Sequence, residues 1–484
     1  MKRWQTTARG RLDCRKLGSL RSALLVCCIS MTGIPALAVQ TPADVRVTDA
    51  RGHSVTITRH VLEPGPARNI PYPGGVSLTR RDFPAGFPLA LGSGLAFKGL
   101  DGENPTFWVV SDRGPNGDGP NIGGEDSKIF PAPRFAPAFG LIRMRGDRVE
   151  LQGVTALHGR EGPLSGLPHE ASGSGATREI PLNDQLQRLP SDNAGIDPEA
   201  IAWDGTQLWV ADEYTPAVLR VDPVTGRVDQ RLTPGDGLPA SFARRRNNRG
   251  MEALTWDARA ARLYGALQSN LDESSRFIRW TEIDPASHGI REFAYPIEPE
   301  DYWKGNPGHA KLGDMTALGD GHFVVIEAGK GATGGEIHRL YRVDSRDATD
   351  IQAISANELE RSSQTGRREG RGDWNRIKPL RKTLLIDLDQ AGWTAEKAEG
   401  LARVDDHTLA LTNDNDFGLT STLVDKAGRA LDGKVERCRL NKNRQLSGDK
   451  CPKSSASVAI TALPPAAARQ QLWLLRFDRP LRDD

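Results

Sequence analysis

Glu199-Ala-Ile-Ala-Trp203 and Glu252-Ala-Leu-Thr-Trp256 are two copies of a short phrase that occurs five times in this chain of 484 residues. In each copy an acidic or small polar residue precedes small or apolar residues and then a bulky one. The other copies are Ser93-Gly-Leu-Ala-Phe97, Asp314-Met-Thr-Ala-Leu318 and Glu399-Gly-Leu-Ala-Arg403. A structural unit repeated on this scale indicates a radial or solenoid architecture.

An apolar run of the β type follows each copy and ends in polar residues. After the second copy, Leu208–Glu213 is followed by Ala217–Asp222 and Arg227–Leu232, with Gly, Asp and Pro in the turns between them. Alternating apolar residues with such turns predict a meander of four antiparallel strands. Meanders of this kind form the blades of β-propellers, so we expect an all-β protein with five readable blades and six possible.

The last copy has only three obvious strands, the third being Gln471–Asp478. We expect an N-terminal strand, Gly75–Arg80, to complete this blade and close the ring, which would remove exposed sheet edges. The segment Val45–Thr58 has the pattern of a hairpin. It could contribute to a sixth blade or form a small accessory piece.

The first 38 residues have the order of a secretory signal peptide, with a basic leader, the apolar stretch Ala23–Ile29 and the small-residue site Ala36-Leu-Ala38. Cleavage after Ala38 predicts a periplasmic or secreted protein with no membrane span, although an uncleaved anchor is the alternative. The mature chain would carry 57 basic and 61 acidic residues, a net charge of −4. This balance gives no case for a nucleic-acid partner, and we expect a monomer.

Cleavage would leave two cysteines, Cys438 and Cys451. In an oxidising compartment they are expected to form a disulfide, with free thiols or half a metal site as the alternative. We divide the mature chain into a hairpin or linker over residues 39–74 and the propeller over residues 75–484. Segments rich in Gly, Pro or charge predict insertions at residues 114–138, 158–195, 359–382 and 418–470.

The strand directions of a propeller predict one polar site. The start of each first strand and the end of each second strand lie at the same mouth of the central channel. The residues expected there are Ser93, Glu199, Glu252, Asp314 and Glu399, together with Asp112, Asp212, Glu213, Asn270, Glu327, Asn413, Asp414 and Asp416. Clustered carboxylates repel one another, and a hard cation such as Ca²⁺ relieves that repulsion outside the cell. Alternatively, the acids bond to backbone amides and only fix the ring.

The predicted metal ligands are Glu199, Glu252, Asp314, Glu399, Asp212, Glu213, Glu327 and Asp414. Arg113, Arg249 and Lys311 lie near the same mouth and are predicted catalytic residues that stabilise developing negative charge. Acids and bases around one mouth suit a small anionic or ester substrate that a metal bridges. A nucleophile and base could be read in Ser165 and His169, but neighbours in one loop lack the separate supports of a triad.

Several phrases resemble the secreted bacterial phytase-like family described as having esterase-like activity of phytase. They include Trp108-Val-Val-Ser-Asp-Arg-Gly114, Pro198-Glu-Ala-Ile-Ala-Trp203, Arg249-Gly-Met-Glu-Ala-Leu-Thr255 and Thr412-Asn-Asp-Asn-Asp-Phe417. The resemblance covers most of residues 85–480 and implies a β-propeller that hydrolyses esters or phosphoesters. A calcium lactonase of the gluconolactonase type and a propeller that only binds a ligand or partner in the cell envelope are the alternatives.

Overall fold

The second copy of the repeated phrase begins a four-stranded antiparallel meander in the computed structural model, which describes residues 44–170, 177–364 and 373–483. Its strands are β10 (Pro198–Trp203), β11 (Leu208–Asp212), β12 (Ala217–Val221) and β13 (Val228–Pro234), which pair in chain order. A short parallel strand, β14 (Gly237–Leu238), extends the outer edge. The predicted meander is confirmed.

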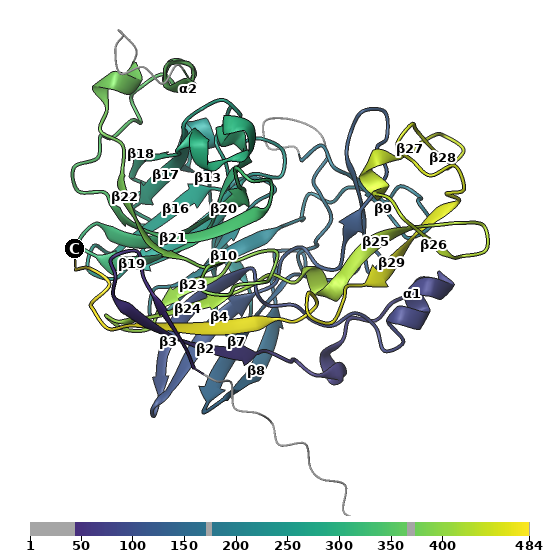
Figure 1. The fold of residues 1–484 in the computed structure, drawn as a ribbon, viewed down its shortest axis with the longest axis horizontal. Helices are drawn as coiled ribbons and strands as arrows, with labels where there is room; N and C mark the ends of the chain where they lie inside the picture. Colours follow the sequence, from purple (N-terminus) through teal and green to yellow (C-terminus); the bar gives the residue numbers. More distant parts are fainter. Residues whose placement is uncertain (1–43, 171–176, 365–372, 484) are drawn as a thin grey trace, which may run out of the picture. The chain divides into compact units, whose positions relative to one another are not determined.

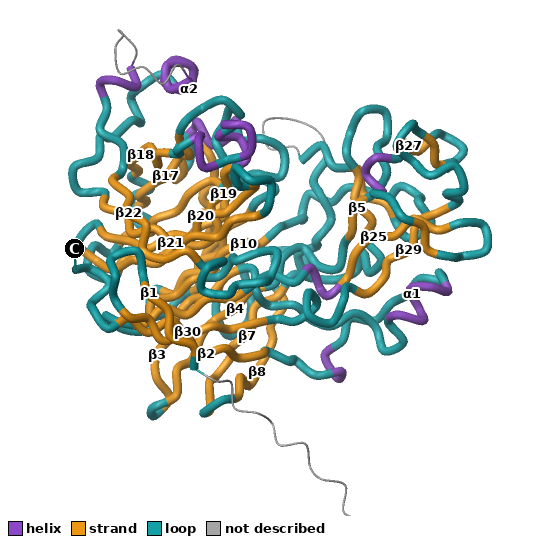
Figure 2. The backbone as a smooth tube through the Cα atoms, viewed as in Figure 1, coloured by secondary structure: helices purple, strands orange, loops and turns teal. Residues whose placement is uncertain are grey.

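Four more sheets follow the same plan (Figures 1 and 2). Two of them are β3 (Gly94–Asp101), β4 (Asn104–Val110), β7 (Ala138–Arg145) and β8 (Arg148–Ala156), then β15 (Met251–Asp257), β16 (Arg262–Leu267), β17 (Phe277–Ile283) and β18 (Ile290–Pro296). The others are β19 (Ala310–Gly319), β20 (His322–Lys330), β21 (Glu336–Asp344) and β22 (Arg381–Asp387), then β23 (Leu401–Arg403), β24 (Thr408–Thr412) and β30 (Gln471–Phe477), joined by β2 (Ser54–Val61) and β1 (Val45–Thr48). The chain is therefore all-β in its main body.

An N-terminal strand does complete the last sheet, but it is not the segment that the sequence predicted. Strand β2 pairs with β30 from Val55 opposite Phe477 to Val61 opposite Gln471. The prediction for residues 75–80 was wrong, because Ser77–Asp82 forms helix α1. The hairpin predicted at residues 45–58 thus belongs to the fifth sheet and starts no sixth one.

The burial patterns explain this difference. Val55 and Ile57 are fully buried and alternate with less buried neighbours, which is the period of a strand with one face on the core. In α1, Thr79 is fully buried, and Phe83 is buried directly after the helix ends. The helix packs on β29 (Ser457–Ala462), and the Thr79 hydroxyl accepts a hydrogen bond from the Ile460 amide.

The first strands of the five sheets contact one another in a closed order. Strand β3 contacts β10, β10 contacts β15, β15 contacts β19, β19 contacts β23, and β23 contacts β3. Small residues permit this approach, since a Cβ on Gly94 would lie 2.7 Å from the Cα of Ala200. Four of these strands also meet through one side chain, because the Asp314 carboxylate accepts hydrogen bonds from the amides of Leu95, Leu254, Met315 and Leu401.

Two insertions, residues 114–138 and 418–470, form a separate β-layer that we call the cap. It contains β5 (Gly117–Asp118) and β6 (Ser127–Ile129), which meet β9 (Ile180–Leu182), and β25 (Leu419–Val424), β26 (Ala430–Leu431) and β29. The hairpin of β27 (Arg439–Leu440) and β28 (Leu446–Ser447) carries the Cys438–Cys451 disulfide, which confirms that prediction. In Figure 1 the cap lies on the right of the sheets, with β27 and β28 at its upper edge.

The excursion between β21 and β22 runs from residue 345 to residue 380 and contains α2 (Ala356–Gln364). Arg279, itself buried, fastens this helix to the third sheet through Glu360 at 3.0 Å and Glu292 at 2.5 Å. The remaining short 3-10 helices are η1 (Pro66–Arg68), η2 (Ala240–Arg244), η3 (Pro299–Asp301), η4 (Trp303–Gly305), η5 (Pro307–His309), η6 (Asp373–Arg376), η7 (Asp416–Gly418) and η8 (Val435–Arg437).

None of the helices in the described parts of the chain has the length and hydrophobicity that a membrane span requires. The predicted signal peptide, residues 1–38, lies outside the described residues.

Candidate functional site

A cavity of about 450 Å³ lies where the first strands begin, and the cap forms part of its wall. Its lining carries nine acidic side chains and five lysines or arginines, so negative charge predominates. The acids are Asp112, Asp118, Glu199, Glu213, Glu252, Glu336, Glu396, Glu399 and Asp416, and the bases are Arg113, Lys128, Arg249, Lys311 and Lys397. The structure thus brings together four of the predicted metal ligands and all three predicted catalytic residues.

Local irregularities at the start of the strands aim the glutamates into this cavity. Glu199 lies at a register shift between Pro198 and Ala200, and Glu252 lies at the equivalent shift between Met251 and Ala253. A bulge leaves one residue out of the ladder and redirects its side chain. The sequence phrase therefore places an acid where the regular pairing is interrupted.

Three carboxylates converge beside β10. One oxygen from each of Asp197, Glu199 and Glu213 lies within 4.8 Å of the others. Asp197 and Glu213 are nearly inaccessible to solvent, whereas Glu199 is partly exposed to the cavity. Sequence reasoning missed Asp197, although it lies only two residues before the Glu199 that began the repeated phrase.

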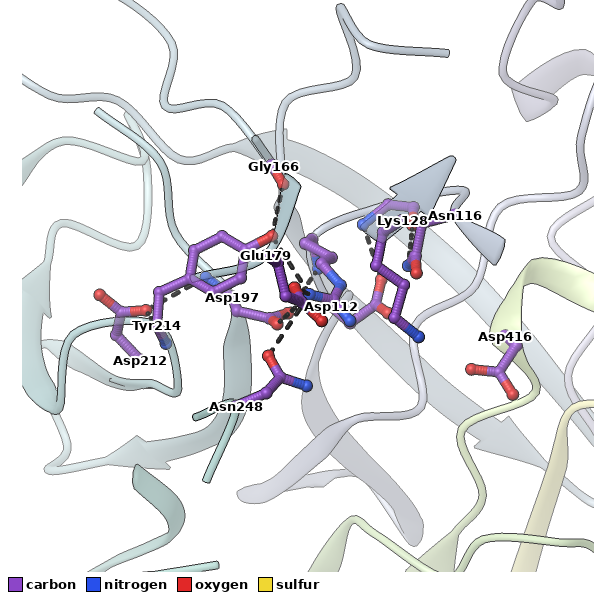
Figure 3. A network of polar contacts seen from close by, with 12 residues as sticks. Asp112, Asn116, Lys128, Gly166, Glu179, Asp197, Asp212, Tyr214, Asn248 and Asp416 are labelled. Carbon is purple, nitrogen blue, oxygen red and sulfur yellow. Dashed lines mark hydrogen bonds and ion pairs between the residues drawn. The ribbon is translucent and has the colours of Figure 1, made fainter. Parts of the chain in front are cut away.

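Arg113 supports this cluster rather than pointing freely into the cavity. Its Nη1 donates to Glu179 Oε2 at 2.7 Å and Asn248 Oδ1 at 3.4 Å, and it lies 3.4 Å from Asp197 Oδ2. The same nitrogen is 3.3 Å from the Tyr214 hydroxyl. Figure 3 shows Glu179, Asp197 and Asn248 converging on one point with Tyr214 beside them.

The environment of these acids favours their protonated forms. Burial, followed by the charges of neighbouring carboxylates, raises the pKa of Glu199 and Glu252 well above the ordinary range. Burial also raises the pKa of Asp197 to about 7, although Arg113 opposes that shift. For Glu399 burial raises the pKa to about 8, although Lys397 opposes the shift.

A second cluster, next to β23, contains its own cation. Lys397 Nζ lies 2.5 Å from Asp414 Oδ2, 2.8 Å from Asp416 Oδ1 and 3.9 Å from Glu399 Oε1. Asp416 and Phe417 both have positive φ angles, 48° and 53°, which are unusual for residues other than glycine. Asp416 lines the cavity, whereas Asp414, a predicted metal ligand, does not line it and is instead an ion-pair partner of Lys397.

Arg249 and Lys311 supply positive charge nearer the centre. The Arg249 guanidinium donates to the Gln268 side chain, which fixes its position. Lys311 is exposed to the cavity but has protein on several sides, and burial together with Arg249 and Lys397 lowers the pKa of its ammonium group. Both side chains are therefore available to an anionic group bound in the cavity.

Asp212 and Glu327, two of the other predicted ligands, point away from the cavity. Asp212 accepts from Arg231 Nη2 at 2.7 Å, because adjacent strand residues face opposite ways and Glu213 takes the cavity side. Glu327 accepts from the hydroxyls of Tyr295 and Tyr302 at 2.6 and 2.7 Å and is paired with Lys382 at 2.6 Å.

The sequence alignment of Asp314 with the glutamates was displaced by one residue. Its amide donors Leu95, Leu254 and Leu401 directly follow Gly94, Ala253 and Gly400, so Asp314 occupies the position of these small residues. Gly313 takes the place of the glutamate and lines the cavity instead. Asp314 is therefore not a ligand in the cavity. It bonds to backbone amides and fixes the strands, which was the alternative prediction for these acids.

The loop residues Ser165 and His169 do not form a nucleophile and base pair. The Ser165 hydroxyl accepts from the Leu167 amide at 3.0 Å. The His169 ring contacts the Gly195 carbonyl oxygen and the Thr215 hydroxyl at 2.6 and 3.3 Å. Both groups are therefore used in holding their own loop.

Comparisons with known proteins place the chain in a family. No curated protein matches the chain. Among solved structures, similarity extends to hydrazine synthase of Kuenenia stuttgartiensis (11% identity, 68% of this chain and 78% of that one, TM-score 0.31) and to a PQQ-bound aldose sugar dehydrogenase of Streptomyces coelicolor (12%, 86% and 98%, 0.27). Because both TM-scores are below 0.5, we infer neither fold nor function from these two structures. The family model described as "Esterase-like activity of phytase" matches residues 90–417, well over half of the chain, and the chain therefore belongs to the phytase-like family.

Proposed function

We propose that this chain is a calcium-dependent hydrolase of ester or phosphoester bonds that acts in the acidic cavity. Membership of the phytase-like family supports a hydrolase. The observation that carries the proposal is the convergence of Asp197, Glu199 and Glu213, whose oxygens lie within 4.8 Å of one another. Such a set of hard oxygen donors is typical of a calcium site.

The donor set fits a hard dication. Calcium binds oxygen ligands at about 2.3–2.6 Å, so two ligands on opposite sides lie about 5 Å apart. Among the described residues, Glu213 Oε1 is buried without a hydrogen-bond donor, which is costly unless a cation or proton compensates, whereas Asp197 Oδ2 has the Arg113 guanidinium at 3.4 Å. A dication held by Asp197, Glu199 and Glu213 would polarise an ester or phosphoryl oxygen.

The remaining chemistry belongs to side chains of the cavity. Arg249 and Lys311 would hold an anionic group of the substrate and stabilise negative charge that develops during the reaction. Glu399, whose raised pKa of about 8 keeps it protonated at neutral pH, is suited to donate a proton to the leaving oxygen. Arg113 would keep Asp197 in place, because its guanidinium lies 3.4 Å from the Asp197 carboxylate. Hydrogen bonds to Glu179 and Asn248 fix the guanidinium itself.

We further infer that the five sheets are the blades of a β-propeller closed by β2. The closed order of contacts among β3, β10, β15, β19 and β23 supports this arrangement. We also infer export to the periplasm or the medium from the leader sequence, and the disulfide is compatible with an oxidising compartment.

Hydrolysis assays with and without calcium test the proposal. The purified protein should cleave a phosphomonoester or a carboxylic ester in calcium and lose this activity in chelator. Glu199→Gln should lower kcat/KM by at least about 100-fold, because it removes a carboxylate from the reacting site. The matched control is Glu103→Gln, whose side chain is exposed in the turn between β3 and β4.

Three outcomes would contradict this assignment. Turnover confined to a lactone would favour the lactonase alternative. Hydrolysis unaffected by chelator would remove the calcium requirement. A protein that hydrolyses none of the three substrate classes, and whose melting temperature does not respond to calcium, would favour a binding protein.

A further inference from the structure

The outer part of the cap, residues 425–456, carries an unusual excess of positive charge. It contains nine lysines and arginines against four acidic residues. The full chain carries a net charge of only +2, so the rest of the molecule is net negative. We call this segment the basic lobe. The positive charge of the basic lobe is confined to this one insertion, because the rest of the chain is net negative.

All nine cationic side chains of the basic lobe are exposed. Arg429 pairs with Asp425 at 2.8 Å and Lys434 lies 3.6 Å from Glu436. Within the part of the chain that the structure describes, no ion pair involves the other seven, which are Lys426, Arg437, Arg439, Lys442, Arg444, Lys450 and Lys453. A solvated face usually mixes both signs of charge, so seven unpaired cations point to an external anionic partner.

The fold holds these charges on a firm support. The Cys438–Cys451 disulfide closes the hairpin of β27 and β28, and both cysteines are buried. Asn121 joins the hairpin to the other half of the cap, because its amide donates to the Cys438 carbonyl and its carbonyl accepts from the Leu440 amide. The cations are thus presented on an ordered surface, which lowers the entropic cost of binding.

The chemistry of the basic lobe narrows the class of partner. Residues 425–456 contain no Phe, Tyr or Trp on which nucleic-acid bases or sugar rings could stack. None of the exposed large hydrophobic residues of the described chain lies there either. Contacts would therefore be electrostatic and would not insert into hydrocarbon. We propose that the basic lobe docks the protein on an anionic lipid bilayer surface.

Docking through the basic lobe would keep the cavity close to the lipid surface. Strand β25 joins the two, since Thr420 and Ser421 line the cavity and Val424 directly precedes the lobe. Three residues of a strand span about 10 Å. The proposal concerns location only, so it holds or fails independently of the reaction that the cavity performs.

Vesicle co-sedimentation tests the proposal with the purified protein. Vesicles of phosphatidylcholine should bind little protein, whereas vesicles with about one-third phosphatidylglycerol should bind it at about 0.05 M NaCl and release it at about 0.5 M, because salt screens the attraction. The combined variant Lys442→Glu, Lys450→Glu and Lys453→Glu should lower the partition coefficient by at least about 100-fold, at about fivefold for each cation lost.

A matched control separates the basic lobe from net charge. Arg46→Glu, Arg145→Glu and Arg148→Glu make the same charge change at exposed positions outside the lobe. This control should retain the binding of the unaltered protein, and equal melting temperatures should show that both variants fold. Equal loss in both variants, equal binding to neutral vesicles, or binding to heparin or single-stranded DNA without binding to vesicles would each overturn the proposal.

Discussion

Asp314→Asn tests whether the axial carboxylate holds the inner strands together. Oδ1 of Asp314 accepts from the amides of Met315 at 2.9 Å and Leu254 at 3.2 Å. Oδ2 accepts from those of Leu401 at 3.3 Å and Leu95 at 3.5 Å. Asparagine keeps one oxygen but sets an NH₂ group against the second pair of donors. Two buried amide groups on neighbouring strands then lose their acceptor.

The distances set the magnitude of the effect. An amide left without a partner in a buried site costs about 1–3 kcal/mol. The bonds to Oδ2 are longer than an ideal N–H···O bond, so each counts at the lower end of that range. We expect a loss of about 2–3 kcal/mol in the free energy of unfolding, and a fall in Tm of about 3–5 °C.

Thermal unfolding followed by circular dichroism measures this loss. Asp101→Asn is a suitable control, because Asp101 is about half exposed and forms only a surface pair with Arg143, which is worth less than about 1 kcal/mol. Burial raises the pKa of Asp314, and its amide donors oppose that shift. An Asn variant as stable as the parent would show that the carboxyl group is already protonated and would refute the argument.

Three further predictions concern residues in or beside the cavity. Lys397→Met should lower the free energy of unfolding by about 1–3 kcal/mol, because its carboxylate partners lose their cation, as urea unfolding would show; an unchanged free energy would contradict this. Gly117→Ala should cost about 1–3 kcal/mol, because the new Cβ overlaps the Ser421 hydroxyl where the two insertions meet; an unchanged Tm would show that the cap adjusts freely. The folded-state pKa values of Asp197 (about 7) and Glu399 (about 8) exceed the ordinary values, so their stabilising effect is complete at low pH and is lost as pH rises through these values. Unfolding in chelator should therefore become easier between about pH 5 and 8, by at most about 1.4 kcal/mol per pH unit for each extra proton, and a flat profile would contradict the raised values.

The sequence predicted the sheets better than it predicted their closure. Runs such as Leu208–Asp212 alternate clearly and are bounded by turn residues, so local pattern is enough to identify them. Residues 75–80 and 54–61 are both short and amphipathic. The choice between them depends on pairing with β30, which begins about 400 residues further along the chain.

Part of the site followed from strand direction alone, as Glu199, Glu252 and Glu399 illustrate. The errors came from information that a short motif lacks. Asp212 and Glu213 are adjacent acids that face opposite ways, and only the register of β11 decides which reaches the cavity.

Asp314 resembles the leading acid of the other copies. Its hydrogen bonds from the Leu254 and Leu401 amides show that it instead matches the residue after that acid. Its position depends on hydrogen bonds between sheets, which the repeated phrase does not reveal. Asp197 lies just before the phrase and could have been found by extending it two residues toward the N-terminus.

Calcium titration by isothermal calorimetry tests the central claim most directly. The unaltered protein should bind calcium near neutral pH with release of protons, because the raised pKa of Asp197, about 7, leaves it partly protonated in the absence of metal. Glu213→Gln should weaken this binding at least about tenfold, while Glu103→Gln should leave it unchanged. Calcium binding that is undetectable in the unaltered protein, or equally strong after Glu213→Gln, would contradict a metal site formed by Asp197, Glu199 and Glu213.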